Sequence, residues 1–200
     1  VATVAKQKLS AVVTATATIR PNADTLAHVS PKVPGRVIEV TALQGAQVKR
    51  GDTLLSIDSI DVGNLATELL EARSTLEVAE ANFKREQDLI DRKATTAVAF
   101  YDAKSQFVRA QADHQAKRDR LILLGWAPER VDKLTWNDSS DRSRLTVTAP
   151  IDGEVIEKHA TLGEVVSPDD NVFTIADLST VWVVIDVYQR DVPRVHSGQP

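Results

Sequence analysis

The sequence predicts an α+β fold in which a long antiparallel helical hairpin interrupts a small β sandwich. Two observations carry this prediction: one stretch of sequence occurs twice, and two amphipathic segments lie between the copies. Strand-like sequence at 11–19 and 178–188 adds a third observation. It predicts that the outer segments pair with each other in an adjoining β domain, since alternating apolar and polar residues are typical of strands.

The repeat emerges when the chain is shifted by 118 residues, which aligns PKVPGRVIEVTALQGAQVKRGDTLLSID (31–58) with APIDGEVIEKHATLGEVVSPDDNVFTIA (149–176). The aligned pairs include Gly35 and Gly153, Gly45 and Gly163, and Val48 and Val166. Each copy has short strand-type runs between Gly, Pro and Asp punctuation. Neither copy is long enough to bury a core alone, so we expect two halves packed face to face. The second copy has SPDD where the first has a turn glycine, and we interpret these aspartates as turn chemistry.

The segments between the copies are helical in pattern. Residues 61–92 and 97–124 carry apolar side chains at steps of three and four, and small alanines alternate with large residues. Glu86 is a polar interruption of the first stripe, and His114 lies on the second. The short KATT turn between the segments predicts an antiparallel pair whose apolar stripes face each other.

The expected helix ends carry capping residues. Ser59 or Asp61 is placed to cap the first helix, and Thr95 or Thr96 the second. Gly125 follows the second helix at the position where a left-handed residue usually ends a helix. The next stretch, APERVDKLT, predicts a short helix that begins near its proline.

Composition excludes several classes of protein. The net charge of −4 provides no basic footprint for nucleic acid. No apolar run reaches the roughly 18 residues of a membrane span. Cysteine and methionine are absent, which excludes disulfides, thiolate metal sites and thioether ligands.

The serines, histidines and carboxylates form no catalytic arrangement, so we expect no enzyme. The missing initial methionine, the lack of a leader and the strand expected after VHSGQP predict a processed piece of a longer protein.

Two half-motifs with glycines at these turns resemble the biotinyl and lipoyl carrier fold. In carriers the halves are adjacent and a lysine between them is modified, whereas here the helical hairpin occupies that place and no MKM or DKA tip is present. A split lipoyl-like domain, or barrel-sandwich hybrid, with an inserted hairpin resembles the periplasmic adaptors, or membrane fusion proteins, of tripartite efflux pumps. LLGWAPERVDKL and FTIADLSTVWVVIDVYQRDVPRVHSGQ resemble the heavy-metal Czc and Cus branch of that family.

The resemblance implies a division into segments. Residues 1–27 and 178–200 would be strands of an adjoining β-barrel domain, 28–58 the first lipoyl-like half and 144–177 the second. Residues 59–125 would be the hairpin, and 126–143 a short helix and connector.

The resemblance also implies a function. The chain would link an inner-membrane proton-driven pump of the resistance-nodulation-division (RND) class to an outer-membrane channel, for export of divalent heavy-metal cations. It would work in the periplasm as a homo-oligomer, hexameric or a trimer of dimers. Attachment to the inner membrane would come through partners or an N-terminal anchor. Alternatives are an adaptor of a multidrug, ATP-driven or secretion system, and a carrier domain.

The resemblance further implies a channel contact at the end of the hairpin. Drug-efflux adaptors carry an arginine, a leucine four residues later and a serine seven beyond that. Arg85, Leu89 and Thr96 have this spacing, with threonine in place of serine, and Arg92 and Thr95 lie beside them. The alternative interpretation is that Arg85 is a solvated helix charge and Leu89 a residue of the helix interface.

Four residues are candidates for metal contact. Glu157 and His159 lie two residues apart on an expected strand, and imidazole with carboxylate suits zinc. Asp191 and His196 lie at the entry to the expected barrel. Neither pair is a complete site, so we expect no resident cofactor and at most transient binding of zinc or another divalent cargo. The absence of methionine favours Zn, Co, Ni or Cd over Cu(I) or Ag(I).

Overall fold

A computed structural model describes residues 13–138 and 141–198. The chain divides into two units: Ala27–Ala176 form one, and the described residues up to Leu26 with those from Asp177 onward form the other. The expected segments 1–27, 126–143 and 178–200 therefore lie partly outside the described residues, at 1–12, 139–140 and 199–200.

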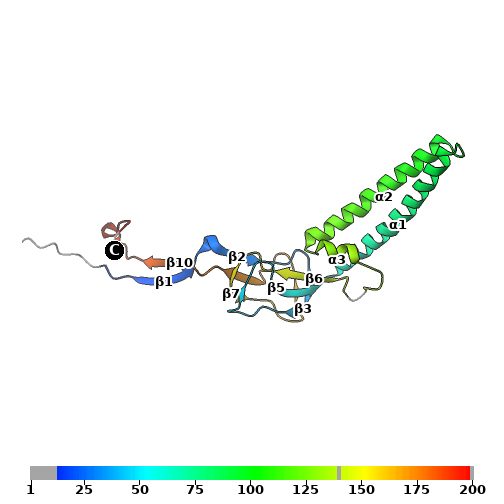
Figure 1. The fold of residues 1–200 in the computed structure, drawn as a ribbon. Helices are drawn as coiled ribbons and strands as arrows, with labels where there is room; N and C mark the ends of the chain where they lie inside the picture. The colour runs from blue at the N-terminus through cyan, green and yellow to red at the C-terminus, as the bar shows by residue number, and fades with distance from the viewer. Residues whose placement is uncertain (1–12, 139–140, 199–200) are drawn as a thin grey trace, which may run out of the picture. The chain divides into compact units, whose positions relative to one another are not determined.

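The larger unit consists of short strands, two long helices and a short third helix (Figure 1). The strands are β2 (Leu26–Val29, shared with the other unit), β3 (Gly35–Val40), β4 (Gln47–Val48), β5 (Thr53–Asp58), β6 (Arg144–Thr148), β7 (Gly153–Lys158), β8 (Val165–Val166) and β9 (Phe173–Ala176). The helices are α1 (Ile60–Asp91), α2 (Ala97–Leu124) and α3 (Pro128–Lys133). The α+β class and the inserted helical hairpin are therefore confirmed. Over the described residues, no helix combines the length and apolarity needed to cross a bilayer.

The two sequence halves do not form one sheet each, and this corrects the expected face-to-face packing. One sheet has the strand order β2-β9-β7-β4 and the other β6-β5-β3-β8. Each sheet therefore takes two strands from each half. The offset of 118 residues maps one strand order onto the other, so the repeat in sequence becomes a twofold relationship in space. Interleaving lets each half use the other's backbone groups to complete its ladder.

Equivalent backbone hydrogen bonds hold the two halves together. The amide of Val37 donates to the carbonyl of Glu164 at 2.8 Å, and the amide of Val155 donates to the carbonyl of Ala46 at 3.0 Å. Residues 37 and 155 differ by 118, as do 46 and 164. Both β3 and β7 also contain a bulge at the matching position. The bulges bend the strands, which allows short strands to wrap around a shared core.

The core lies between the sheets and continues into the base of the hairpin. Its buried side chains include Leu54, Leu55 and Ile57 of β5, Phe173 and Ile175 of β9, and Val62, Leu65, Leu69 and Leu121 of the helices. All four central residues of β5 are buried, so this strand packs on both faces. Burying one such aliphatic side chain contributes roughly 1.5–3 kcal/mol. The hairpin is therefore anchored in the sandwich core.

The SPDD stretch forms a turn that its own side chains stabilise, as predicted. The amide and hydroxyl of Ser167 donate to one carboxylate oxygen of Asp170, at 2.7 and 2.8 Å. The Ser167 hydroxyl and amide lower the pKa of Asp170 because they stabilise its charged form. The first copy uses the equivalent bond from the amide of Lys49 to Asp52, at 2.8 Å.

The helix ends confirm one predicted cap and correct another. Thr96 caps α2 by accepting a hydrogen bond from the amide of Ala99 at 3.2 Å, and Gly125 ends α2 with a φ of 119°. Ser59 precedes α1, but its hydroxyl makes no capping bond. It is fully buried, and its amide donates to the carbonyl of Ser143. Asp61 is the acidic residue of the first turn, where a negative charge favours the start of the helix.

The smaller unit contains an antiparallel ribbon of β1 (Thr16–Pro21) and β10 (Val181–Asp186), so the two outer strands pair as predicted. Ala11 and Val12 of the predicted first strand lie outside the described residues. All six side chains of β10 are exposed over the described residues.

Candidate partner-binding surface of the helical hairpin

The hairpin is held by a seam of small and aromatic side chains. Ala72, Ala79, Ala103 and Ala110 are buried between α1 and α2, and these small residues let the two backbones approach closely. Phe83 stacks on Phe107, with ring centroids 5.4 Å apart and an interplanar angle of 7°. Phe100 packs against Phe83 at 5.7 Å. Stacked aromatic pairs contribute about 0.5–1.5 kcal/mol beyond their burial, so the seam stiffens the far half of the hairpin.

The turn is closed by hydrogen bonds of the backbone and of one half-buried carboxylate. The amide of Lys93 donates to the carbonyl of Ile90 at 3.0 Å, and that of Ala94 donates to the carbonyl of Leu89 at 2.8 Å. The hydroxyl of Thr95 donates to Oε2 of Glu86 at 2.8 Å. The Glu86 side chain is only 14% exposed. Glu86, the polar residue within the first apolar stripe, therefore connects α1 to the turn through this hydrogen bond.

Four of the five predicted contact residues lie at the turn or at the end of α1, and Arg85 lies further along the helix. Arg92 and Thr96 are exposed at the turn, and half-buried Thr95 lies beside them. Half-buried Leu89 packs at the end of the helix. Arg85 lies six residues before the last residue of α1, about 9 Å along the helix.

Arg85 has partners of its own on α1. Its guanidinium donates to the side-chain oxygen of Asn82 and lies 3.6 Å from the carboxylate of Glu86. Arg85 also lines an open groove between α1 and α2, together with Val78, Arg109 and Ala110.

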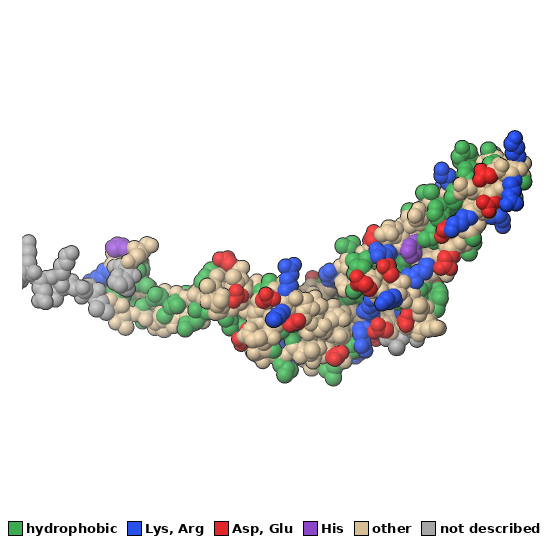
Figure 2. All heavy atoms as spheres, viewed as in Figure 1, with side chains coloured by type: hydrophobic (Ala, Val, Ile, Leu, Met, Phe, Trp, Pro, Cys, Tyr) green, Lys and Arg blue, Asp and Glu red, His purple; other side chains and the backbone are tan. Residues whose placement is uncertain are grey.

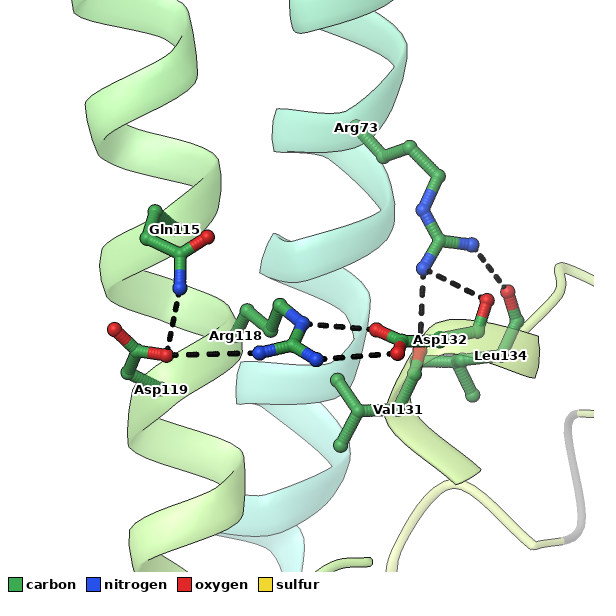
Figure 3. Close-up of polar contacts among 7 residues, drawn as sticks. All are labelled: Arg73, Gln115, Arg118, Asp119, Val131, Asp132 and Leu134. Atoms are coloured by element: carbon green, nitrogen blue, oxygen red, sulfur yellow. Dashed lines mark hydrogen bonds and ion pairs between the residues drawn. The ribbon is translucent and has the colours of Figure 1, made fainter. Parts of the chain in front are cut away.

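The base of the hairpin is clamped to α3 (Figure 3). Arg73 on α1 donates hydrogen bonds of 2.7, 3.1 and 3.4 Å to the carbonyls of Leu134, Val131 and Asp132. Arg118 on α2 forms a bidentate pair with the Asp132 carboxylate, at 2.8 and 3.1 Å. That hydrogen bond lowers the pKa of Asp132. Each hairpin helix therefore contributes one arginine to the end of α3.

His114 lies beside this clamp, on the seam as predicted. It is half-buried, and its Nε2 atom has no hydrogen-bond partner within the described part of the chain. Burial lowers the pKa of His114, and the charges of Arg73 and Arg118 lower it further. The neutral imidazole is therefore the form that the fold favours.

The predicted metal residues form two separate pairs. Nε2 of His159 lies 3.6 Å from Oε2 of Glu157, and both side chains are more than half exposed. The same carboxylate oxygen accepts a hydrogen bond from Thr174 at 3.0 Å. Across the described residues, no cluster of three or more potential ligands of this kind is present. The first pair thus offers two ligands to a cation.

The second pair, Asp191 and His196, lies in the smaller unit. Arg190 and Arg194 approach the Asp191 carboxylate at 3.2 and 3.6 Å. These two arginines would compete with a cation for Asp191.

Sequence reasoning missed the clamp and the conformation of Lys93. Arg73 and Asp132 resemble ordinary solvated helix charges, because their partners are backbone carbonyls or lie 14 residues away. Lys93 has a φ of 55° and is the one non-glycine residue with positive φ in 13–138 and 141–198. The only signal in the sequence for this conformation was that no glycine follows the first helix.

Comparison with known proteins identifies relatives of this chain. The family described as CzcB-like, barrel-sandwich hybrid domain matches residues 25–177. The cobalt-zinc-cadmium resistance protein CzcB of Cupriavidus metallidurans is 36% identical over 181 residues, covering 90% of this chain and 33% of that protein. The nickel and cobalt resistance protein CnrB of the same organism is 26% identical over 195 residues, covering 98% of this chain and 46% of CnrB.

A solved structure agrees with these relatives. The crystal structure of ZneB from Cupriavidus metallidurans matches with a TM-score of 0.67 and 28% identity, over 92% of this chain and 73% of ZneB. The chain spans about a third of the length of CzcB. Since the family match covers both halves of the sandwich and the whole hairpin, this chain belongs to the CzcB-like barrel-sandwich hybrid family.

Proposed function

We propose that this chain is the central part of a periplasmic adaptor in a tripartite efflux pump that exports divalent heavy-metal cations. The adaptor would bridge an inner-membrane proton-driven RND pump to an outer-membrane channel. One observation carries the proposal: a split sandwich of the CzcB-like family holds a long hairpin rigidly at its base. The work is mechanical and non-enzymatic.

The dimensions of the hairpin suit a bridging role. With 32 residues, α1 is about 48 Å long. The base of the hairpin shares its core with the sandwich, and the clamp of Arg73 and Arg118 ties it to α3. A contact at the far end is therefore held at a defined distance from the sandwich.

The channel would bind at the end of the hairpin. Arg92, Thr95 and Thr96 lie at the turn, and Leu89 and Arg85 lie below them on α1. Guanidinium groups offer donors to partner carbonyls and carboxylates, while leucine supports an apolar contact.

The cargo assignment rests on relatives whose names refer to cobalt, zinc, cadmium and nickel resistance. Zinc contact through His159 and Glu157 would be transient, because this pair supplies two ligands and a stable zinc site needs three or four. Asp191 and His196 would join such contacts only if other ligands reached them. We place the protein in the periplasm, attached to the inner membrane through its partners or another segment, as a hexamer or trimer of dimers.

Deletion of the gene from its native host, followed by growth in graded zinc, cobalt, nickel and cadmium, tests the function. We expect increased sensitivity to at least one of these metals and restoration by the native gene. Unchanged tolerance of all four would contradict the metal assignment. Sensitivity to dyes or antibiotics instead would select a drug-efflux adaptor. Mass spectrometry of the native protein tests the carrier alternative, which requires a biotinyl or lipoyl adduct.

A further inference from the structure

His114 is a titratable side chain in the seam of the hairpin, beside the clamp that holds α3. It is half-buried, and its Nε2 atom is buried without a hydrogen-bond partner among the described residues. A neutral imidazole can leave this nitrogen without a proton, whereas an imidazolium carries an N–H group at both ring nitrogens. Protonation would therefore create a buried donor with no acceptor in the present arrangement, which is costly.

Charged groups from all three helices at the base of the hairpin surround this ring. They are Arg73 on α1, Asp113 and Arg118 on α2, and Asp132 on α3. Figure 2 shows acidic and basic side chains gathered in this region. Burial is the main cause that lowers the pKa of His114, and the two arginines lower it further, against the opposing effect of the two carboxylates. The closed arrangement therefore disfavours a proton on the ring.

Both carboxylates already have a basic partner. Asp132 accepts two hydrogen bonds from Arg118, and Asp113 pairs with Lys117 at 2.9 Å. Among the charged groups around the ring, a protonated His114 could gain an acceptor only by taking one of these carboxylates from its partner. Asp132 lies across the interface, on α3, so a protonated ring would compete with Arg118 for it.

The two arginines beside the imidazole are the residues that hold α3. Arg73 donates hydrogen bonds to three carbonyls in 131–134, and Arg118 forms the bidentate pair with Asp132. Within the six residues of α3, only Val131 is buried. Polar contacts therefore carry much of the attachment of α3, and a positive charge placed among them acts directly on that attachment.

We propose that His114 is a proton-operated release for the clamp between the hairpin and α3. While the ring is neutral, Arg73 and Arg118 keep their partners and α3 stays attached. A proton on the ring adds a third positive charge beside the two arginines and a donor that competes for Asp132, so the contacts with 128–134 loosen. This inference goes beyond the proposed adaptor function and depends only on the fold of the hairpin base.

The direction of the effect follows from linkage between the proton and the clamp. The pKa of the ring lies below 6.5 in the closed arrangement and returns towards 6.5 when release exposes the ring to water. The released form therefore binds the proton more readily. The clamp is fully closed above about pH 6.5, and it loosens as the pH falls from that value towards the lowered pKa of the closed form.

The test is amide hydrogen exchange of the full-length protein at about pH 7.5 and about pH 5.5, corrected for the intrinsic pH dependence of exchange. In the wild type, we expect 128–134 to exchange about fivefold faster or more at the lower pH, because local release exposes its amides. Strand β5 is the internal control, since its buried Leu54, Leu55 and Ile57 do not titrate, and its exchange should change less than about twofold. Equal acceleration of β5 and 128–134 would indicate global acid unfolding and overturn the inference.

Two variants assign the response to the imidazole. His114→Gln stays neutral at both pH values, so its exchange over 128–134 should lack the pH response. Asp132→Asn removes the carboxylate that binds Arg118 and should give fast exchange over 128–134 already at the higher pH, as expected of a released clamp. A pH response in His114→Gln equal to that of the wild type would contradict the inference.

The pH dependence of the wild type provides a second measure that needs no substitution. Exchange over 128–134 should accelerate between about pH 6.5 and about pH 5, the range in which a histidine with a lowered pKa gains its proton. Acceleration confined to pH values below about 4 would assign the release to a carboxylate and would also overturn the inference.

Discussion

The hydroxyl of Thr95 lies 2.8 Å from Oε2 of Glu86, nine residues earlier in the chain. This bond joins the turn of the hairpin to the interior of α1, where the Glu86 side chain is only 14% exposed. A carboxylate at a seam position would normally be costly to bury. Here it accepts a hydrogen bond from the turn, so the polar residue helps to define where the hairpin reverses.

Replacing Thr95 by valine should destabilise the hairpin. The change keeps the side-chain shape but removes the Thr95 hydroxyl donor to Oε2 of the half-buried Glu86 carboxylate, at a cost of about 1–2 kcal/mol. Urea unfolding followed by helix circular dichroism would measure it. The matched control is Thr75→Val, which removes an exposed hydroxyl bonded only within α1 and should cost less than about 0.5 kcal/mol. Equal losses in the two variants would contradict the role of the bond.

Disrupting the aromatic seam should destabilise the hairpin more than removing the Thr95 hydroxyl does. Phe83→Asp would place a carboxylate against Phe100 and Phe107, and we expect a loss of about 3–5 kcal/mol. Val108→Asp introduces the same charge one residue from Phe107 on an exposed position and should be nearly neutral. Differential scanning calorimetry distinguishes the two. An unchanged melting temperature for Phe83→Asp would rule out this seam.

The clamp at α3 predicts a local effect. Arg73→Met keeps the apolar stem but removes the donors to the carbonyls of Val131, Asp132 and Leu134. Since a hydrogen bond to a charged group contributes about 1.5–3 kcal/mol, amide hydrogen exchange over 128–134 should accelerate at least tenfold. Arg109→Met serves as the control because Arg109 lines the open groove away from α3. Acceleration by both variants alike would mean that the clamp does not hold α3.

Acidification should weaken the hairpin base through His114. The folded state lowers the pKa of this imidazole below 6.5, first by burial and then by the charges of Arg73 and Arg118, which outweigh Asp132 and Asp113. The unfolded chain therefore binds the proton more readily, so stability is full above about pH 6.5 and falls as the pH drops through that value. Melting temperatures between pH 8 and 5 should decline more steeply for the wild type than for His114→Gln. Parallel curves would contradict this linkage.

The alignment of Gly35 with Gly153 and the apolar steps of 61–92 and 97–124 were sufficient to predict the inserted hairpin and its antiparallel direction. These features could be predicted because periodicity and turn residues act over a few neighbours. The helix α2 begins and ends at the predicted residues because Thr96 and Gly125 are local signals. The same local reasoning failed at Ser59, which precedes α1 but makes no capping bond, because its buried hydroxyl has no hydrogen-bond partner within the described residues.

The amino-acid sequence by itself determined that there are two similar half-domains and a helix pair between them. Only the tertiary structure decided that each sheet takes strands from both halves, because strand pairing depends on backbone groups that meet across 100 or more residues, as Val37 meets Glu164. It also decided which charges are available to a partner. Arg85 and Lys93 are both exposed basic residues near the end of the hairpin, but the fold supplies contacts for Arg85 and holds Lys93, in the turn between α1 and α2, in a conformation suited to glycine.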